Sequence, residues 1–397
     1  MPPPGAPASC QGRHRASTRF EWFCCDGGDP AKLVADFLAG NGLSVRNTGR
    51  TATQVHPTGA GTVCGAALYV SAAAGSVMAG GPAGPPSPVP GIPDVYAVVY
   101  LHGSGLGGSQ APWPDGETPA QSGSVRPPWW LGEWTPSWTP KEHAAAVDAV
   151  RAAIGRGDVY QVNVVGHASA PYRGDPMPAL GRVAALPGAR YGGVLAGEGW
   201  AIATASPETL IEVRDGRVIT RPIKGTRPAT RPGRAELLAS AKERAEHIMI
   251  VDLERNDLAH VPGVGPVTVD ELFAVRRWVD LWQAESVISA PIESDLDLAD
   301  LLRAVCPGGS VTGAPKLAAL TEISALEPVG RGVSMGGIGW IGHDHLDLAL
   351  TIRTVAADGT HLHAWAGGGI TWDSDPTAEV EEAAAKAAPI RAALAGL

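Results

Sequence analysis

The sequence has few cysteines and lacks several patterns that would identify a class of protein. Five cysteines are spread over 397 residues, with no CxxC pair, so neither a zinc site nor a disulfide framework is expected. None lies in a Gly-x-Cys-x-Gly turn, the usual setting of a glutaminase nucleophile. No Walker GxxxxGK[ST] segment and no strand–GxGxxG–helix unit is present. The cysteine usage leaves a reducing cytoplasm as the expected location.

Long apolar runs and basic stripes are also missing. No run approaches the length of a membrane-spanning helix. The net charge of −9 argues against nucleic acid as the main partner, and 44% hydrophobic with 18% charged residues is a globular balance. Residues 1–20 are rich in proline and lack an apolar core, so we expect a loose tail rather than a signal peptide.

Two loop-like segments interrupt the first third of the chain. One is the Ala/Gly/Pro stretch that ends at Asp94, and the other covers residues 103–140. The second segment carries five tryptophans: Trp113, Trp129, Trp130, Trp134 and Trp138. Such residues form a ligand surface or pack a long loop onto the body, and we favour packing. We therefore divide the chain into the tail, an N-terminal portion over 21–138 and a catalytic portion over 139–397.

The catalytic portion alternates runs of strands with occasional helices. Helices are predicted over 139–157, 234–252, 297–305, 315–326 and 377–394. Strands are predicted between them, among them 332–342, 346–359 and 361–370. Runs of strands broken by helices indicate an α+β fold rather than a repeated βαβ unit.

Lysine is scarce, and one lysine has an unusual setting. Only six of the 31 basic residues are lysine, and Lys224 lies in the glycine-flanked segment RPIKGTRP. A partly desolvated lysine can lose its proton and become a nucleophile, which arginine cannot do. The alternative is an ordinary surface cation at a strand end.

Two predicted helices each carry a pair of glutamates on one face. Glu243 and Glu246 are three residues apart, and Glu379, Glu382 and Lys386 follow the same helical spacing. Two facing pairs of carboxylates can enclose Mg²⁺, which takes a few carboxylates with water and a ligand oxygen. The alternative is the common decoration of a solvated helix.

Two glycine-rich turns precede helices or follow strands, namely CPGGSVTGAPK (306–316) and AGGGI (366–370). Backbone N–H groups in such turns can bind anions. Arg353, in LTIRT, lies near a strand end and can pair with a carboxylate of a ligand or of the protein.

The order of these segments resembles the chorismate-utilising enzymes over residues 139–394. The family includes anthranilate synthase, isochorismate and salicylate synthases and aminodeoxychorismate synthase component I. The matching blocks, in chain order, are GDVYQVN, SPETLIEV, PIKGTRP, KERAEHIMIVDLERNDLAHV, PGGSVTGAPK, RGVSMGGIG, LTIRT and AGGGI-TWDSDPTAEVEEAAAK. The resemblance implies two facing antiparallel sheets surrounded by helices, with the active site between them.

Two positions divide the subfamilies. Gln161 stands where the water-adding members carry a lysine base, which implies ammonia as the nucleophile. PIKGT, with Lys224, resembles aminodeoxychorismate synthases, whereas anthranilate synthases have PIAGT. The resemblance thus implies that Lys224 is a covalent nucleophile and that the product is 4-amino-4-deoxychorismate.

The same resemblance implies roles for the other residues. Glu208 would be the acid and base, and Mg²⁺ would be held by Glu246 and Glu382. Glu243 and Glu379 would support the ion through water. The remaining substrate-binding positions are Thr312, Gly368 and Gly369 for the ring carboxylate, Arg353 and Lys386 for the enolpyruvyl carboxylate, and Gln161 and Ser334 beside the ring.

Two departures from the family and one absence shape the expected function. Gln283 replaces a family histidine and Ser334 a family tyrosine. With no glutaminase signature, we expect a separate glutamine amidotransferase to supply ammonia for a route to 4-aminobenzoate, for folate or a specialised metabolite. The alternatives are an anthranilate synthase large subunit or aminodeoxyisochorismate-type synthase, and a degraded subunit that only binds a partner.

Overall fold

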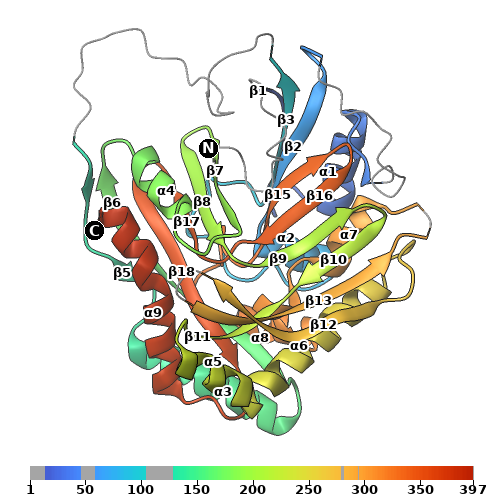
Figure 1. The fold of residues 1–397 in the computed structure, drawn as a ribbon. Coiled ribbons are helices and arrows are strands. Elements are labelled where there is room, and N and C mark those ends of the chain that lie inside the picture. The colour runs from blue at the N-terminus through green and yellow to red at the C-terminus, as the bar shows by residue number, and fades with distance from the viewer. Residues whose placement is uncertain (1–13, 46–58, 104–127, 279–280, 294, 397) are drawn as a thin grey trace.

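The fold consists of two antiparallel sheets with helices around them (Figure 1). The computed structural model describes residues 14–45, 59–103, 128–278, 281–293 and 295–396. Every strand pair in these ranges is antiparallel, as expected when strands are joined by short turns rather than by crossover helices. The α+β class predicted from the sequence is confirmed.

The larger sheet has ten strands and combines the N-terminal portion of the chain with the catalytic portion. Its order is β1 (His14–Trp22), β3 (Val95–His102), β2 (Val63–Val70), β15 (Gly337–Gly342), β16 (His345–Leu350), β9 (Thr209–Arg214), β10 (Arg217–Arg221), β13 (Leu281–Pro291) and β11 (Ile223–Pro228), with β12 (Thr268–Trp278) also paired to β13. The first and last strands in this order, β1 and β11, therefore lie at opposite ends of one sheet.

The smaller sheet has eight strands and lies against the larger one. Its order is β14 (Gly313–Ala314), β6 (Gln161–Arg173), β18 (His361–Ile370), β17 (Thr354–Ala357), β8 (Trp200–Ser206) and β7 (Tyr191–Gly197), with β4 (Trp130–Leu131) and β5 (Thr135–Pro136) paired to β6. The long pair β6–β18 runs through the middle of this sheet. The glycine-rich segment 366–370, expected as a turn after a strand, is instead the last half of β18 and pairs with residues 162–166 of β6.

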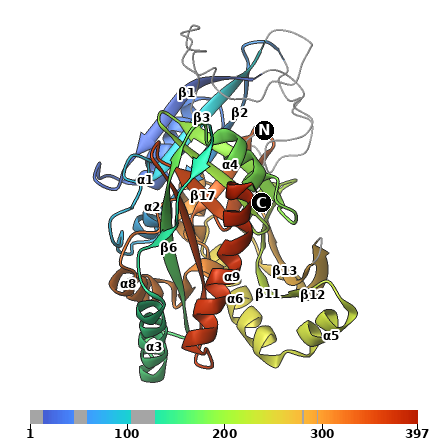
Figure 2. The same cartoon turned by 90° about the vertical axis from the view of Figure 1, so that its left-hand side faces the viewer.

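The helices cover the outer faces and the lower edge of the two sheets (Figures 1 and 2). They are α1 (Pro30–Gly40), α2 (Ala72–Met78), α3 (Pro140–Arg156), α4 (Met177–Ala184), α5 (Arg231–Ala239), α6 (Ala241–Ala259), α7 (Leu298–Val305), α8 (Lys316–Leu326) and α9 (Pro376–Ala395). Helix α3 is confirmed, and its ends have clear causes. Thr139 and Glu142 form a capping box at its start, and Gly157 ends it at φ 84°.

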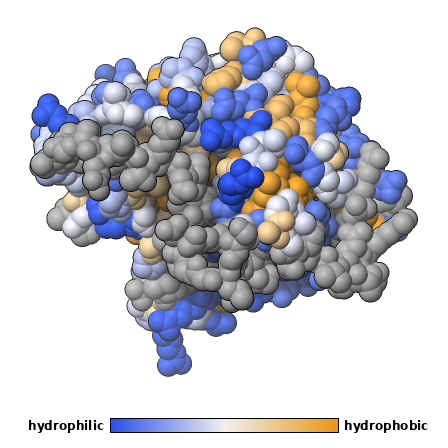
Figure 3. All heavy atoms as spheres, turned by 90° about the horizontal axis from the view of Figure 1, so that it is seen from above, coloured by the Kyte–Doolittle hydropathy of each residue, from blue (hydrophilic) through white to orange (hydrophobic). Residues whose placement is uncertain are grey.

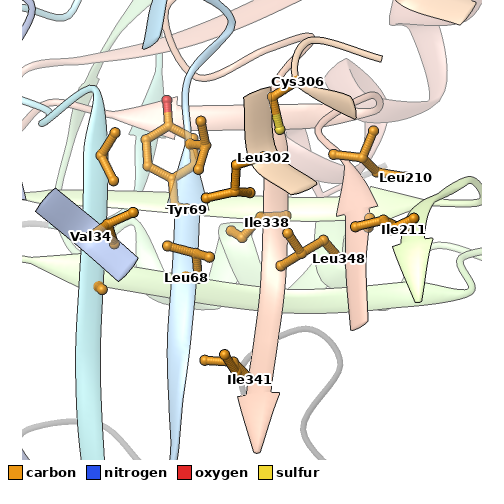
Figure 4. Packing of buried hydrophobic residues seen from close by; sticks show 14 of the residues in the cluster. Val34, Leu68, Tyr69, Leu210, Ile211, Leu302, Cys306, Ile338, Ile341 and Leu348 are labelled. Atoms are coloured by element: carbon orange, nitrogen blue, oxygen red, sulfur yellow. The ribbon is translucent and has the colours of Figure 1, made fainter. Parts of the chain in front are cut away.

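The largest hydrophobic cluster covers both faces of the larger sheet and extends to the smaller sheet. It contains Leu68 of β2, Ile338 of β15 and Leu348 of β16 from the larger sheet, and Val165 of β6 and Ile202 of β8 from the smaller one. Figure 4 shows the larger sheet's contribution, with α1 and α7 packed on it. Burial of apolar area on this scale is the main driving force for joining the two sheets.

Four expected element bounds differ from the structure. Residues 14–20, expected in a loose tail, form most of β1 because they pair with β3. The helix expected over 234–252 is two helices, since Ser240 adopts an extended conformation at ψ 104° and caps α6 through the Glu243 N–H. The segment 346–359 forms two strands, β16 and β17, separated at Arg353 with φ 50°. In addition, the strand expected over 332–342 begins only at Gly337.

The described tryptophans of the long loop mostly pack against the body, as we favoured. Trp129 donates from Nε1 to the Leu394 carbonyl at 3.2 Å, Trp134 lies under the Arg391 guanidinium, and Trp138 stacks on His143. Trp130 is 48% exposed. Trp113 lies outside the described residues.

The outer surface is polar over much of the face shown in Figure 3, with apolar atoms gathered in one region. Among the described residues, no helix is both long enough and apolar enough to cross a membrane.

Candidate active site

The predicted site residues meet where the two sheets and two helix starts converge. β11 brings Lys224, the start of β9 brings Glu208, and the end of β18 brings Gly368 and Gly369. The loop between α7 and α8, which includes a short 3-10 turn at Gly309–Val311, lies against α6 and β18. Helix α6 packs against β11, and helix α9 packs along β18.

Lys224 and Glu208 are both held by Ser310. The Lys224 Nζ donates to the Ser310 carbonyl at 3.0 Å, and the Ser310 hydroxyl donates to Glu208 Oε1 at 2.6 Å. Glu208 is only 4% exposed. The lysine therefore points into the protein and toward a buried carboxyl group, and the reading of Lys224 as a surface cation does not fit.

Burial brings the pKa values of Lys224 and Glu208 closer together. It lowers the pKa of the Lys224 ammonium, and the nearby charge of Lys386 acts in the same direction, against the attraction of Glu208. Burial also raises the pKa of the Glu208 carboxyl, against the hydrogen bond from Ser310 and the charge of Lys224. A neutral amine beside a protonated carboxyl group is therefore an accessible state of this pair, and it is the state that a nucleophile and an acid require.

The four glutamates lie in the first two turns of α6 and α9. Glu243 and Glu379 occupy first-turn positions, where the partial positive charge of a helix start favours carboxylates. Glu246 accepts a hydrogen bond from the Thr371 hydroxyl at 3.5 Å, next to the end of β18. Burial raises the pKa of Glu246, and the charges of Glu243 and Glu379 add to the effect. The carboxylates of α6 and α9 are therefore close enough to influence one another's charge.

Gly368 is the point on β18 where three of the charged side chains meet. A Cβ there would lie 3.0 Å from Glu379 Oε2, 3.7 Å from Lys386 Nζ and 3.9 Å from Glu382 Oε1. Because Gly368 has no side chain, the charged groups of Glu379, Glu382 and Lys386 can lie close to the backbone of β18, and we call this place the cradle. Lys386 is bound on one side to Glu382 at 2.6 Å and on the other to the Gly367 carbonyl at 2.9 Å.

This donor set suits a hard divalent cation such as Mg²⁺. All four groups are carboxylates, Glu382 is 57% exposed at its side chain, and the cradle at Gly368 opens beside it. Within the described ranges no three of these carboxylates have oxygens within 4.8 Å of one another. Since Mg²⁺ takes one or two carboxylates plus water and substrate oxygens, Glu246 and Glu382 would be sufficient. Lys242 and Lys386 neutralise these two residues in the structure, at 3.8 Å and 2.6 Å.

Arg353 lies at the break between β16 and β17 with φ 50°, a conformation that non-glycine residues rarely adopt. Its half-buried guanidinium forms no ion pair with any described carboxylate within 4 Å. Burial lowers its pKa, whereas the charge of Glu208 raises it, so the two groups are near one another. A half-buried cation at a positive φ, with no described carboxylate within 4 Å, is suited to bind a substrate carboxylate. Lys386, expected to support Arg353 from the final helix, contacts Glu382 and the Gly367 carbonyl.

Gln161 of β6 and Gly369 of β18 lie next to each other. Gln161 is 1% exposed, and neither atom of its side-chain amide has a described hydrogen-bond partner. A Cβ on Gly369 would lie 2.4 Å from the amide nitrogen, so only glycine leaves room for it. Thr312 is fully buried, and its hydroxyl donates to the Gly308 carbonyl at 2.8 Å within its own loop. A buried amide without partners marks a place for a ligand or water.

The two residues that depart from the family pattern are both buried. Gln283 on β13 is 3% exposed and lies opposite Thr226 of β11, one strand from Lys224. Ser334 is 1% exposed and donates to the Thr351 carbonyl at 3.3 Å. Ser334 is thus engaged with the backbone just before Arg353.

Three residues near the site were not identified from the sequence as functional. Ser310 joins Lys224 to Glu208, although only its place in a glycine-rich turn was noted. His247 of α6 is fully buried, with Nε2 2.5 Å from the Ser286 hydroxyl, and burial lowers its pKa to about 4. Glu254 is 8% exposed and accepts from Thr220 at 2.9 Å. His247 and Glu254 both lie in the block KERAEHIMIVDLERND, which belongs to the matching segments. The sequence alone did not show which face of this helix is buried, so neither residue could be identified.

Comparisons with known proteins all indicate the same family. The family model for chorismate binding enzymes matches residues 108–392. The chain is 40% identical over 271 residues to aminodeoxychorismate synthase component 1 of Salmonella typhimurium, covering 66% of this chain and 60% of that protein. It is 39% identical over 259 residues to anthranilate synthase component 1 of Streptomyces coelicolor, covering 63% and 50%. The alignments thus span about half to three fifths of these curated relatives, under both names.

Solved structures agree on the fold. Anthranilate synthase component I from Streptococcus pneumoniae superposes with a TM-score of 0.74 at 24% identity, covering 95% of this chain and 91% of that one. The menaquinone-specific isochorismate synthase of Escherichia coli gives 0.62 at 16% identity, covering 99% and 96%. At these identities the likeness concerns the fold and leaves the reaction to the site residues.

Proposed function

The chain belongs to the family of chorismate-binding enzymes, and we propose that it aminates chorismate with ammonia to give 4-amino-4-deoxychorismate. The observation that carries this proposal is the position of Lys224, partly buried near Glu208 with both groups held by Ser310. A lysine in this place can form a covalent bond to the substrate ring, which the alanine of the PIAGT pattern cannot do.

The first half of the reaction uses Lys224 and Glu208. The neutral amine of Lys224 attacks C2 of chorismate, the ring double bonds shift, and the C4 hydroxyl leaves with the proton of Glu208 as water. Arg353 holds the enolpyruvyl carboxylate during this step. The backbone N–H groups near Gly368 and Gly369, with Thr312, hold the ring carboxylate. The amide of Gln161 lines the place where ammonia enters.

The second half reverses the roles. Ammonia bonds to C4, the bond from C2 to Lys224 breaks, and the lysine leaves as an amine. The new C4 ammonium returns a proton to Glu208, so the sum is chorismate and ammonia giving the amine and water. Mg²⁺, held by Glu246 and Glu382 with Glu243 and Glu379 supporting through water, would stabilise charge on the ring carboxylate.

We propose that ammonia comes from a separate glutamine amidotransferase subunit. This chain has no Gly-x-Cys-x-Gly turn, and its buried Cys306 is a poor nucleophile because burial raises the pKa of the thiol to about 12. Glutamine-dependent turnover by this chain alone would refute this part of the proposal. The product would feed a lyase that releases 4-aminobenzoate.

Anthranilate synthesis is the second candidate, because relatives with that name are about as similar as those named aminodeoxychorismate synthase. The test is mass spectrometry of the product formed from chorismate, Mg²⁺ and ammonium. Our proposal requires a product that retains the enolpyruvyl ether, whereas anthranilate lacks it. Absence of any turnover under these conditions would favour a degraded subunit that only binds a partner.

A companion experiment tests the covalent step. Wild-type protein incubated with chorismate and Mg²⁺ but without ammonia should gain a substrate-derived mass, and Lys224→Ala should not. An adduct of equal yield on both proteins would place the attachment elsewhere and overturn the role of Lys224.

A further inference from the structure

Three metal-binding side chains come together at the far end of the larger sheet. His14 begins β1, Cys64 lies in β2 and His102 ends β3, on three neighbouring strands. One donor atom of each residue, an imidazole nitrogen or the thiol sulfur, lies within 4.8 Å of the other two. Among the described residues this is the one group of three or more such ligands that is so close together.

The strand register explains why these side chains converge. His14 and His102 are direct partners across the β1–β3 pair, so their side chains share one face, and their ring centroids are 5.3 Å apart. The β2–β3 pairing shifts between Val63 and Gly65, which leaves Cys64 as the extra residue of a bulge. A bulge redirects a side chain that strict alternation would send elsewhere. Here it brings Cys64 to the two imidazoles.

The surroundings are those of a built site rather than of a chance surface cluster. Cys64 has no exposed area and belongs to the main hydrophobic cluster, and His102 is 8% exposed. His14 is partly exposed, which leaves an approach from solvent.

We propose that His14, Cys64 and His102 bind a zinc ion. Thiolate and imidazole ligands select zinc among the common divalent ions, whereas Mg²⁺ and Ca²⁺ require oxygen ligands. In a tetrahedral site the ligand atoms are roughly 3.3–3.6 Å apart, so small rotations of the three side chains close the site. The fourth position is left for water. The cysteine spacing in the sequence gave no sign of this site because its ligands come from three separate strands.

We expect the ion to stabilise the edge of the larger sheet that is formed by β1. β1 pairs only with β3 within the described strands, so its start depends on few contacts. A metal that joins β1, β2 and β3 would stabilise this edge, because metal binding to the folded state adds to folding free energy. Lys224 lies on β11, the strand at the opposite end of the same sheet, so the site is separate from the proposed chemistry.

The test uses Co²⁺ as a spectroscopic substitute for zinc on the metal-stripped full chain. We expect one equivalent to produce a thiolate-to-cobalt charge-transfer band and the strong visible bands of tetrahedral cobalt. Cobalt can also occupy the carboxylate site, but only the thiolate band reports a cysteine ligand. Zinc added afterwards should remove the band and raise the unfolding temperature.

Two variants and one control complete the test. Cys64→Ser should abolish the band, and His14→Gln, a milder change at a partly exposed position, should weaken cobalt binding at least about tenfold. Cys306→Ser, which removes a buried thiol of the same core cluster, should leave the band unchanged. No thiolate band in wild type, or a band that persists in folded Cys64→Ser, would overturn the proposal. If Cys64→Ser does not fold, unchanged affinity in His14→Gln would overturn it alone.

Discussion

Lys224 and Glu208 are held by the same residue, Ser310, one through its main-chain carbonyl and the other through its hydroxyl. The two contacts fix the distance between amine and carboxyl group without joining them directly. A proposed nucleophile and a proposed acid are thus positioned by a single turn of a glycine-rich loop.

Lys224→Arg should abolish product formation although it keeps the positive charge. Arginine remains protonated at all accessible pH values, so it cannot serve as the amine nucleophile. Loss of a covalent nucleophile typically costs several orders of magnitude in kcat. Steady-state kinetics with chorismate and ammonium measures this, with Lys141→Arg, an exposed lysine of α3, as the control. Retention of more than about a tenth of the activity would show that position 224 needs only charge.

Ser310→Ala should move the pH dependence of adduct formation. The hydroxyl of Ser310 lowers the pKa of Glu208, so its removal raises that pKa further. Since Glu208 must be protonated to act as the acid, the alkaline limb of the rate profile should shift to higher pH. Ser137→Ala, which removes a hydroxyl that donates to the His167 carbonyl, should leave the profile in place. An unshifted limb in Ser310→Ala would argue against Glu208 as the acid.

Glu382→Gln should weaken Mg²⁺ binding. It removes one of the two carboxylates expected to hold the ion, and we expect the Mg²⁺ dissociation constant to rise by at least about tenfold. Isothermal titration calorimetry, with and without chorismate, is the appropriate measurement. The exposed neighbour Glu381 supplies the matched control Glu381→Gln. Equal affinities in the two variants would remove Glu382 from the metal site.

Arg353→Lys should raise KM for chorismate more than it lowers kcat. Lysine keeps the charge and the same backbone demand at φ 50°, but it cannot form a bidentate pair with a carboxylate. Loss of a charged hydrogen bond costs about 1.5–3 kcal/mol, which corresponds to roughly a 10- to 150-fold rise in KM. Arg303→Lys, at a surface pair with Asp300, should change neither constant. A kcat defect with an unchanged KM would assign Arg353 to the chemical step instead.

Glu254→Gln should remove a pH-dependent loss of stability. Burial raises the pKa of Glu254 to about 8 from an ordinary value of 4.5, and the charge of Glu208 adds to the effect. Between these values the unfolded chain has released a proton that the folded chain still holds. The stabilising contribution of Glu254 is therefore complete below the ordinary value and is lost progressively as the pH rises toward the folded one.

The difference in unfolding free energy between Glu254→Gln and wild type should consequently shift in favour of the variant by up to about 1.4 kcal/mol per pH unit over this window. Urea denaturation at three pH values across the window measures it. Glu236→Gln, at an exposed position of α5, should show a constant difference. A constant difference for Glu254→Gln as well would mean that its carboxyl group is ionised in the folded protein.

The sequence predicted elements well where local signals agree with the fold. The capping box at Thr139 and the left-handed Gly157 mark the two ends of α3 with signals that lie in the local sequence. Ser240 was missed as a boundary because the helical pattern continues through it on both sides. The interruption between β16 and β17 was not predicted, because no residue near Arg353 indicates a positive φ at this position. Both misses lie next to the site, where packing overrides propensity.

The site residues could be predicted as a set but not as a geometry. The order of motif blocks identified Lys224, Glu208 and the two glutamate pairs. It could not show that Gly368 sits under Glu379, Glu382 and Lys386, because that depends on how α9 packs along β18. The His14, Cys64 and His102 group depends in the same way on strand register and on a bulge.

Helix α9 comes after every strand of both sheets, yet it carries Glu379, Glu382 and Lys386. During synthesis the proposed nucleophile and acid therefore emerge from the ribosome well before three of the charged groups proposed to surround the substrate. A nascent chain that has already joined its sheets still lacks Glu382, one of the two carboxylates proposed to bind the metal, and the charged groups beside Gly368. In the proposed mechanism the reaction is thus delayed until this helix docks, which separates the assembly of the framework from the onset of reactivity.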